Sequence, residues 1–143
     1  MTDSAPAARS GRWLRAIVYG FLAEVATIIT IIIVVKCYQY VIAPGQADPV
    51  YAAFGERAGG IIGIVGGSLF TFLSARLLMR RVSERQVAHG IVVAVAAIAL
   101  SVGGSLAGHH GVPLGYIVAS VLKLGAGALA GILAARGARP TAA

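Results

Sequence analysis

The longest stretch of the chain without a formal charge runs from Gln86 to Leu122, 37 residues between Arg85 and Lys123. Two shorter stretches, of 18 and 12 residues, follow Arg57 and Lys123. A helix rises 1.5 Å per residue, so about 20 apolar residues cross the hydrocarbon layer of a bilayer. With 58% hydrophobic and 12% charged residues over 143 positions, the composition argues against a water-soluble domain and predicts a multi-span membrane protein.

The 37-residue stretch is too short for two full spans and a turn unless one span includes Lys123. The Gly108–Pro113 segment, with its glycines and proline, provides the turn. We therefore predict an all-α protein, a four-helix transmembrane bundle over residues 14–136, with helices over about 14–41, 59–79, 87–107 and 114–135. Residues 1–13 and 137–143 are predicted to be tails.

Lys and Arg residues collect in three short segments that set the predicted orientation. Arg9, Arg12 and Arg15 precede the first helix, Arg80, Arg81 and Arg85 follow the second, and Arg136 and Arg139 end the chain. Short basic segments stay on the cytoplasmic side, so both termini are predicted to be cytoplasmic. The net charge of +7 is then a topology signal, and no nucleic-acid partner is expected. Ten arginines against two lysines suggest a GC-rich genome and hence a bacterial cytoplasmic (inner) membrane.

Glycines recur at four-residue spacing in two of the predicted helices. Gly59, Gly63 and Gly67 form one series, and Gly127 and Gly131 form the other. Small residues let helix backbones approach closely in lipid. The two series predict tight packing within the bundle or, as the alternative, contacts between chains in a homo-oligomer.

The second pair of helices could be a copy of the first. At an offset of 70 residues, Gly20 and Val25 align with Gly90 and Val95, and the second and fourth helices align at an offset of 60. Each half would then be a helical hairpin, with both hairpins in one orientation, as in parallel transporter repeats. Because Ala, Gly, Val and Leu dominate the whole chain, chance similarity is an equal alternative.

Glu24 and Lys123 are the most deeply placed charges in the predicted helices. Their depths differ by about one helical turn at 1.5 Å per residue, and a lysine side chain can span part of that difference. A carboxylate in the hydrocarbon layer needs a partner or a proton. Glu24 and Lys123 are therefore predicted to pair, with Thr27 near the same face and Arg76 as the alternative partner. The pair could fix helix packing or handle protons during transport.

Gly20 and the run Leu22-Ala23-Glu24-Val25 resemble the first helix of the small multidrug resistance transporters. The resemblance covers about six of the 143 positions and implies, for Glu24 alone, alternate binding of protons and cationic drugs. The predicted third helix has no Trp or Tyr where that family has its aromatic substrate face, and the first loop is longer. Membership of the family is therefore not inferred.

The sequence contains no recognisable catalytic, cofactor or metal motif. His109 and His110 are adjacent, so their side chains diverge, and no nearby Asp, Glu or Cys completes a metal site. We expect no enzyme activity and no cofactor.

The preferred function is that of a structural or accessory protein of a larger membrane complex, with the 43–57 loop and the glycine series as contact surfaces. The alternative is a proton-coupled cation transporter that works as a homo-oligomer through Glu24. Both functions need the lipid bilayer as a partner.

Overall fold

The computed structural model describes residues 5–107 and 114–137, and every regular element in these ranges is a helix. Four helical segments are long and apolar enough to cross a membrane: Arg12–Ile42, Asp48–Met79, Gln86–Ala107 and Leu114–Gly137. The predicted all-helical fold with four long apolar helices is thus confirmed. The predicted turn at Gly108–Pro113, with His109 and His110, lies outside the described residues.

The first two segments contain π-helical turns. Helix α1 (Ala5–Cys37) continues into η1 (Tyr38–Ile42). Helix α2 (Asp48–Ile61) continues through η2 (Ile62–Gly66) into α3 (Gly67–Met79). Helix α4 (Gln86–Ala107) and helix α5 (Leu114–Gly137) make up the other two segments. Most of residues 1–13, predicted to be a tail, therefore belong to α1.

The second helical segment begins at Asp48, whereas the sequence analysis predicted Gly59. The prediction of a loop over residues 43–57 is therefore wrong from residue 48 onward. Asp48 lies in the first turn, where a negative charge is stabilised by the helix dipole, and proline follows at one of the first helical positions. Proline has no amide hydrogen to lose there, and its φ angle already suits a helix. These local signals start the helix before its apolar part begins.

Tyr51 fixes the short connection between η1 and α2. Its hydroxyl accepts a hydrogen bond from the Gln46 amide at 2.8 Å and donates one to the Ala43 carbonyl oxygen at 2.8 Å. The ring of Tyr38 stacks on Phe54, with centroids 3.8 Å apart. The corner between the first two helical segments is therefore an ordered part of the fold.

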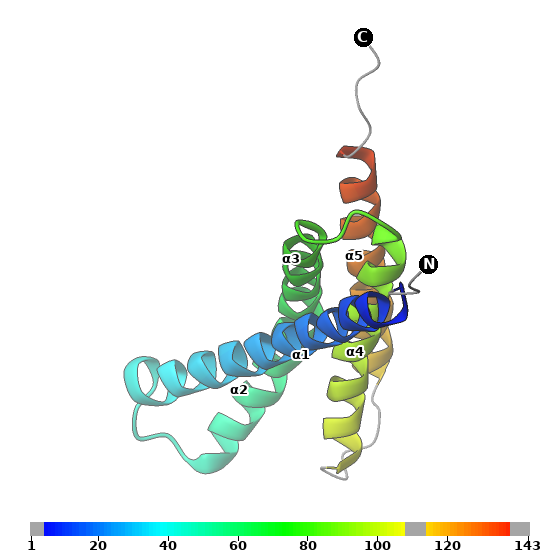
Figure 1. Cartoon of the computed structure of the whole chain (residues 1–143). Helices are drawn as coiled ribbons and strands as arrows, with labels where there is room; N and C mark the ends of the chain where they lie inside the picture. Colours follow the sequence, from blue (N-terminus) through cyan, green and yellow to red (C-terminus); the bar gives the residue numbers. More distant parts are fainter. Residues whose placement is uncertain (1–4, 108–113, 138–143) are drawn as a thin grey trace.

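Helices α3, α4 and α5 lie side by side, and α1 crosses them obliquely (Figure 1). Glycines allow the backbones to touch where these helices meet. A β-carbon on Gly20 of α1 would collide with the carbonyl oxygen of Val93 in α4. A β-carbon on Gly90 of α4 would collide with the carbonyl oxygen of Gly127 in α5, and one on Gly131 would lie 2.5 Å from the α-carbon of Val87.

The buried core lies in the half of the bundle that contains the start of α1, the end of α3, the start of α4 and the end of α5. Its members are Ala16, Ala75, Leu78, Met79, Val82, Val93 and Ala130. The start of α1 is held against the start of α4 by Trp13, whose ring stacks on His89 with centroids 4.2 Å apart. One half of the protein is thus tightly closed, with glycines at the helix crossings and Ala, Val, Leu and Met side chains in the core.

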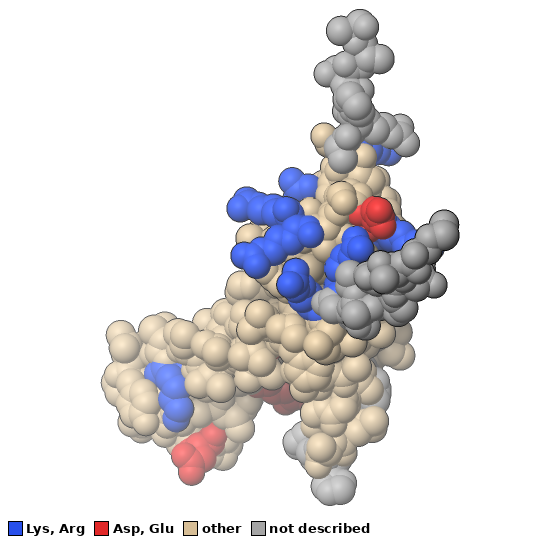
Figure 2. Space-filling model, viewed as in Figure 1, with Lys and Arg blue, Asp and Glu red and all other residues tan. Residues whose placement is uncertain are grey.

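Arginines, most of them exposed, surround this closed half, which we call the basic end. It comprises the start of α1, the end of α3, the turn before α4 and the end of α5, and Figure 2 shows basic side chains gathered there. The described arginines at this end are Arg12, Arg15, Arg76, Arg80, Arg81, Arg85 and Arg136. The three basic segments of the sequence therefore meet at one end of the fold.

The opposite half of the bundle is splayed open. The chain bends at η2, and α2 together with the second half of α1 extends to one side, away from α4 and α5 (Figure 1). Sharp bends of this kind are common at π-helical turns. A β-carbon on Gly63 would meet nothing within 4 Å, and one on Gly59 only a methyl group of Ile31 at 4.0 Å. Within this chain the first glycine series therefore does not pack tightly at these two positions.

Candidate functional site

Glu24 and Lys123 form a buried ion pair in the middle of the bundle. Glu24 is contributed by α1 and Lys123 by α5, and the lysine Nζ donates a hydrogen bond to the glutamate Oε2 at 2.5 Å. Only 5% of Glu24 and 2% of Lys123 is exposed. Two residues 99 positions apart thereby hold the first and last helices together.

Ser101 of α4 completes the contact. Its hydroxyl donates to Glu24 Oε1 at 2.8 Å and accepts from Lys123 Nζ at 3.3 Å. Both carboxylate oxygens therefore have a partner, and three helices meet in one closed network. Sequence reasoning missed Ser101. The available signal was its spacing from Ser105, one turn away, in a helix that is otherwise almost entirely apolar.

Gly67, at the start of α3, makes room for the lysine. A β-carbon there would lie 2.8 Å from Cε of Lys123 and 3.7 Å from Cγ2 of Thr27. Thr27 is 1% exposed, and its hydroxyl donates to the Ala23 carbonyl oxygen at 2.9 Å. Gly67 thus leaves room for the Lys123 side chain, and Thr27 packs beside the ion pair without a hydrogen bond to it.

Arg76, the alternative partner for Glu24, is exposed in the last turn of α3 at the basic end. Among the described residues, the cation paired with Glu24 is Lys123. Removing two charges from water costs several kcal/mol per ion, and their attraction offsets this cost only where geometry and hydrogen bonds are good. The shared Ser101 supplies such a bond to each partner.

An open cavity of about 590 Å³ lies beside this network. Five of the helical elements contribute to its walls: α1, α2, η2, α4 and α5. Glu24, Ser101, Ile64 and Ala119 line the part nearer the basic end, and Glu56, Ser105, Gly104 and Tyr116 line the part farther from it. Ligand sites in proteins commonly have volumes of about 300–1,000 Å³ with few polar groups in an apolar wall, so the open cavity has the size and composition of such a site.

Carboxylates are the formally charged groups in the wall of the open cavity. Glu24 and Glu56 line it, whereas no lysine or arginine does among the described residues. Glu56 forms no ion pair with any described residue. Gly59 of α2 and Gly63 of η2 also line the cavity, so the uncrowded glycine face of this segment is one of its walls. Because Lys123 compensates Glu24, the uncompensated carboxylate in this wall is that of Glu56.

Metal binding receives no support from the part of the chain that the structure describes, where no cluster of three or more His, Cys, Asp or Glu side chains could hold an ion. Comparisons with models of protein families, with curated proteins and with solved structures find no match for this chain.

Proposed function

We propose that this chain is a multi-pass integral membrane protein of the bacterial cytoplasmic membrane, with both termini in the cytoplasm. The four long apolar helices support the first part of this proposal. The gathering of arginines at one end supports the orientation, because basic segments stay on the cytoplasmic side. The bilayer would surround the many large apolar side chains that the fold leaves exposed, which include Ile28, Ile32 and Leu129.

Within the membrane the protein acts as an accessory subunit of a larger complex. The observation that carries this proposal is the contrast between the two glycine series. Gly127 and Gly131 are pressed against α4, whereas nothing lies within 4 Å of a β-carbon on Gly63. Small residues on an uncovered helix face allow another helix to approach closely. The face of the α2–η2 segment that carries Gly59 and Gly63 would receive a helix of a partner or of a second copy.

Site-specific photo-crosslinking in intact cells tests the accessory role. A photoreactive residue in place of Gly63 should give one discrete adduct, whose mass spectrum identifies a partner subunit or a second copy. Leu129 of α5, which is 50% exposed, is the matched control, because a side chain there faces outward from the bundle. Equal, diffuse labelling of lipid from both positions would contradict the accessory role.

A second candidate function is proton-coupled transport of a cation by a homo-oligomer. The observation that favours it is that Glu24, the paired carboxylate, also lines the open cavity. In this mechanism Glu24 would bind either a proton or a cationic substrate, so that both ligands compete for one carboxylate. Lys123 would compensate the charge of Glu24 when neither ligand is bound.

Proton release distinguishes transport from a purely structural pair. Purified protein in weakly buffered detergent should release protons when lipophilic cations are added, and Glu24→Gln should abolish the release. Glu84→Gln is the matched control, because Glu84 is an exposed carboxylate 3.8 Å from Arg12 at the basic end, far from the open cavity. Release that persists in Glu24→Gln would exclude Glu24 as the exchanging group.

A further inference from the structure

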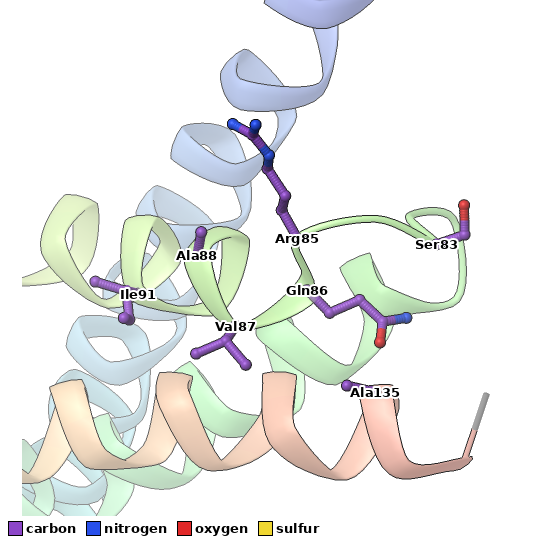
Figure 3. A pocket seen from close by; sticks show the side chains of 7 residues that line it. All are labelled: Ser83, Arg85, Gln86, Val87, Ala88, Ile91 and Ala135. Atoms are coloured by element: carbon purple, nitrogen blue, oxygen red, sulfur yellow. The ribbon is translucent and has the colours of Figure 1, made fainter. Parts of the chain in front are cut away.

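A second hollow lies at the basic end, away from the buried ion pair. It is a shallow groove of about 580 Å³ lined by Ser83, Arg85, Gln86, Val87, Ala88, Ile91 and Ala135. Figure 3 shows these residues on the turn before α4, along the first turns of α4, and near the end of α5. We call it the interfacial groove, because this end of the helices would meet the membrane–water boundary if the four segments span a bilayer.

Polar and apolar groups are separated along the interfacial groove. Ser83 and Arg85 belong to the turn and Gln86 begins α4, whereas Val87 and Ile91 follow along α4 and Ala135 lies on α5. The Arg85 and Ser83 side chains extend in different directions (Figure 3). A small inorganic anion would use only the first of these parts. A molecule with a charged head and an apolar chain would use both.

Arg85 is available for a ligand. Its side chain is exposed and forms no ion pair with a described residue. Its backbone adopts a φ of 49°, which is uncommon for a residue with a side chain. Its carbonyl oxygen is already occupied, because it accepts from the His89 amide at 3.1 Å and lies 3.0 Å from the His89 Nδ1. The guanidinium group is therefore the free polar part of this residue.

The surroundings of the groove carry a large excess of positive charge. Seven described arginines lie at the basic end, and Glu84 places its carboxylate 3.8 Å from one of them, Arg12. Clusters of arginine beside membrane helices attract anionic lipid headgroups, by about 1 kcal/mol for each basic residue near the surface. Charge complementarity thus selects an anionic occupant over a zwitterionic one.

We propose that the interfacial groove binds an anionic phospholipid, with its phosphate near Arg85 and one acyl chain along Val87 and Ile91. Arginine is suited to phosphate oxygens, since its guanidinium group donates several hydrogen bonds to them. The apolar part of the groove accommodates the chain. This inference rests on the proposed membrane placement, but neither on the accessory role nor on transport.

Lipid selectivity provides the test. Purified protein would be placed in nanodiscs containing equal amounts of phosphatidylglycerol and phosphatidylcholine with identical acyl chains, and the lipids that remain bound after release would be counted by native mass spectrometry. We expect phosphatidylglycerol to be retained preferentially, and Arg85→Gln to lower that preference about fivefold, as the loss of one interfacial arginine implies. Arg57→Gln removes the same charge from α2, outside the groove, and should leave the preference unchanged.

A variant without a charge change tests the apolar part of the groove. Ala135 is exposed, so Ala135→Phe can fill the groove without overpacking the core, and it should also lower the retention of phosphatidylglycerol. Glycerol 3-phosphate should not displace the lipid, and displacement would mean that the groove binds a free phosphate instead. Equal retention of the two lipids, or equal losses in Arg57→Gln and Arg85→Gln, would overturn the proposal.

This experiment distinguishes a wrong proposal of membrane placement from a wrong proposal of a lipid site. A chain that does not enter nanodiscs of phosphatidylcholine alone would overturn both proposals. A chain that enters them with its helical circular dichroism spectrum intact, and then shows no lipid preference, would overturn the lipid site alone.

Discussion

The ε-carbon of Lys123 lies against Gly67, where a β-carbon would come within 2.8 Å of it. The absence of a side chain on α3 at this point lets the lysine stem pass between α3 and α5 to reach Glu24 on α1. Gly67 belongs by spacing to the series with Gly59 and Gly63, yet its role differs from theirs. It accommodates a charged side chain where the others border the open cavity.

Gly67→Ala should therefore destabilise the protein by about 1–3 kcal/mol, the usual cost of overpacking a core. The added methyl group would push Lys123 away from Glu24 and weaken the ion pair. Gly63→Ala is the matched control, because nothing lies within 4 Å of a β-carbon there. Thermal unfolding in detergent, followed by circular dichroism, measures both changes. Equal melting temperatures for the two variants would contradict the role of Gly67 in making room for Lys123.

Glu24→Gln and Lys123→Met should each destabilise the protein by about 3–5 kcal/mol, because each strands one buried charge. The double variant leaves neither charge, so its loss should be clearly smaller than the sum of the single losses. The free energies of unfolding of the four proteins form a double-mutant cycle. Additive losses would show that the two residues do not interact.

Gly127→Ala should loosen the contact between α4 and α5. A β-carbon on Gly127 would collide with the carbonyl oxygen of Gly90, which is backbone and cannot swing aside as a side chain can. We expect a loss of about 1–3 kcal/mol in the free energy of unfolding. Gly125→Ala, two residues away with nothing within 4 Å, should leave this free energy unchanged or raise it. A destabilised control would show that any alanine in α5 has the same effect.

Cys37 offers a direct test of the orientation, because it is exposed and is the single cysteine of the chain. It ends α1 on the side away from the basic end. A membrane-impermeant maleimide should therefore label it in intact cells freed of their outer membrane. In the Cys37→Ser background, Ser83→Cys places an exposed thiol in the turn before α4, and it should react only after the cells are opened. The reverse pattern would invert the proposed topology.

Much of the architecture could be predicted from the sequence, because long apolar runs between charges leave few alternatives to helices. The partners Glu24 and Lys123 could also be named in advance, because each is a rare charge deep in an apolar helix. The structure places the two side chains in direct contact. Whether it serves packing or transport stays a prediction.

Other features depended on tertiary structure. Ser101 has no charge to mark it, and its role requires α4 to place its hydroxyl between Glu24 and Lys123. The possible repeat gave no guide to packing, because the aligned residues Gly20 and Gly90 contact different helices, α4 and α5. The open half could not be foreseen either, since a π-helical turn has no distinct apolar pattern.

That π-helical turn links the bend of the second helical segment to its length in residues. A π turn holds about one residue more than the α turn it replaces, so η2 (Ile62–Gly66) is equivalent to a single-residue insertion. Both kinds of turn complete one revolution, so deleting one residue within Ile62–Gly66 would leave α2 with the same face towards α4 and α5. The deletion would restore α-helical hydrogen bonds through the segment and remove the cause of the bend. A one-codon change in length could thus straighten the segment and close the open cavity while α2 kept its face.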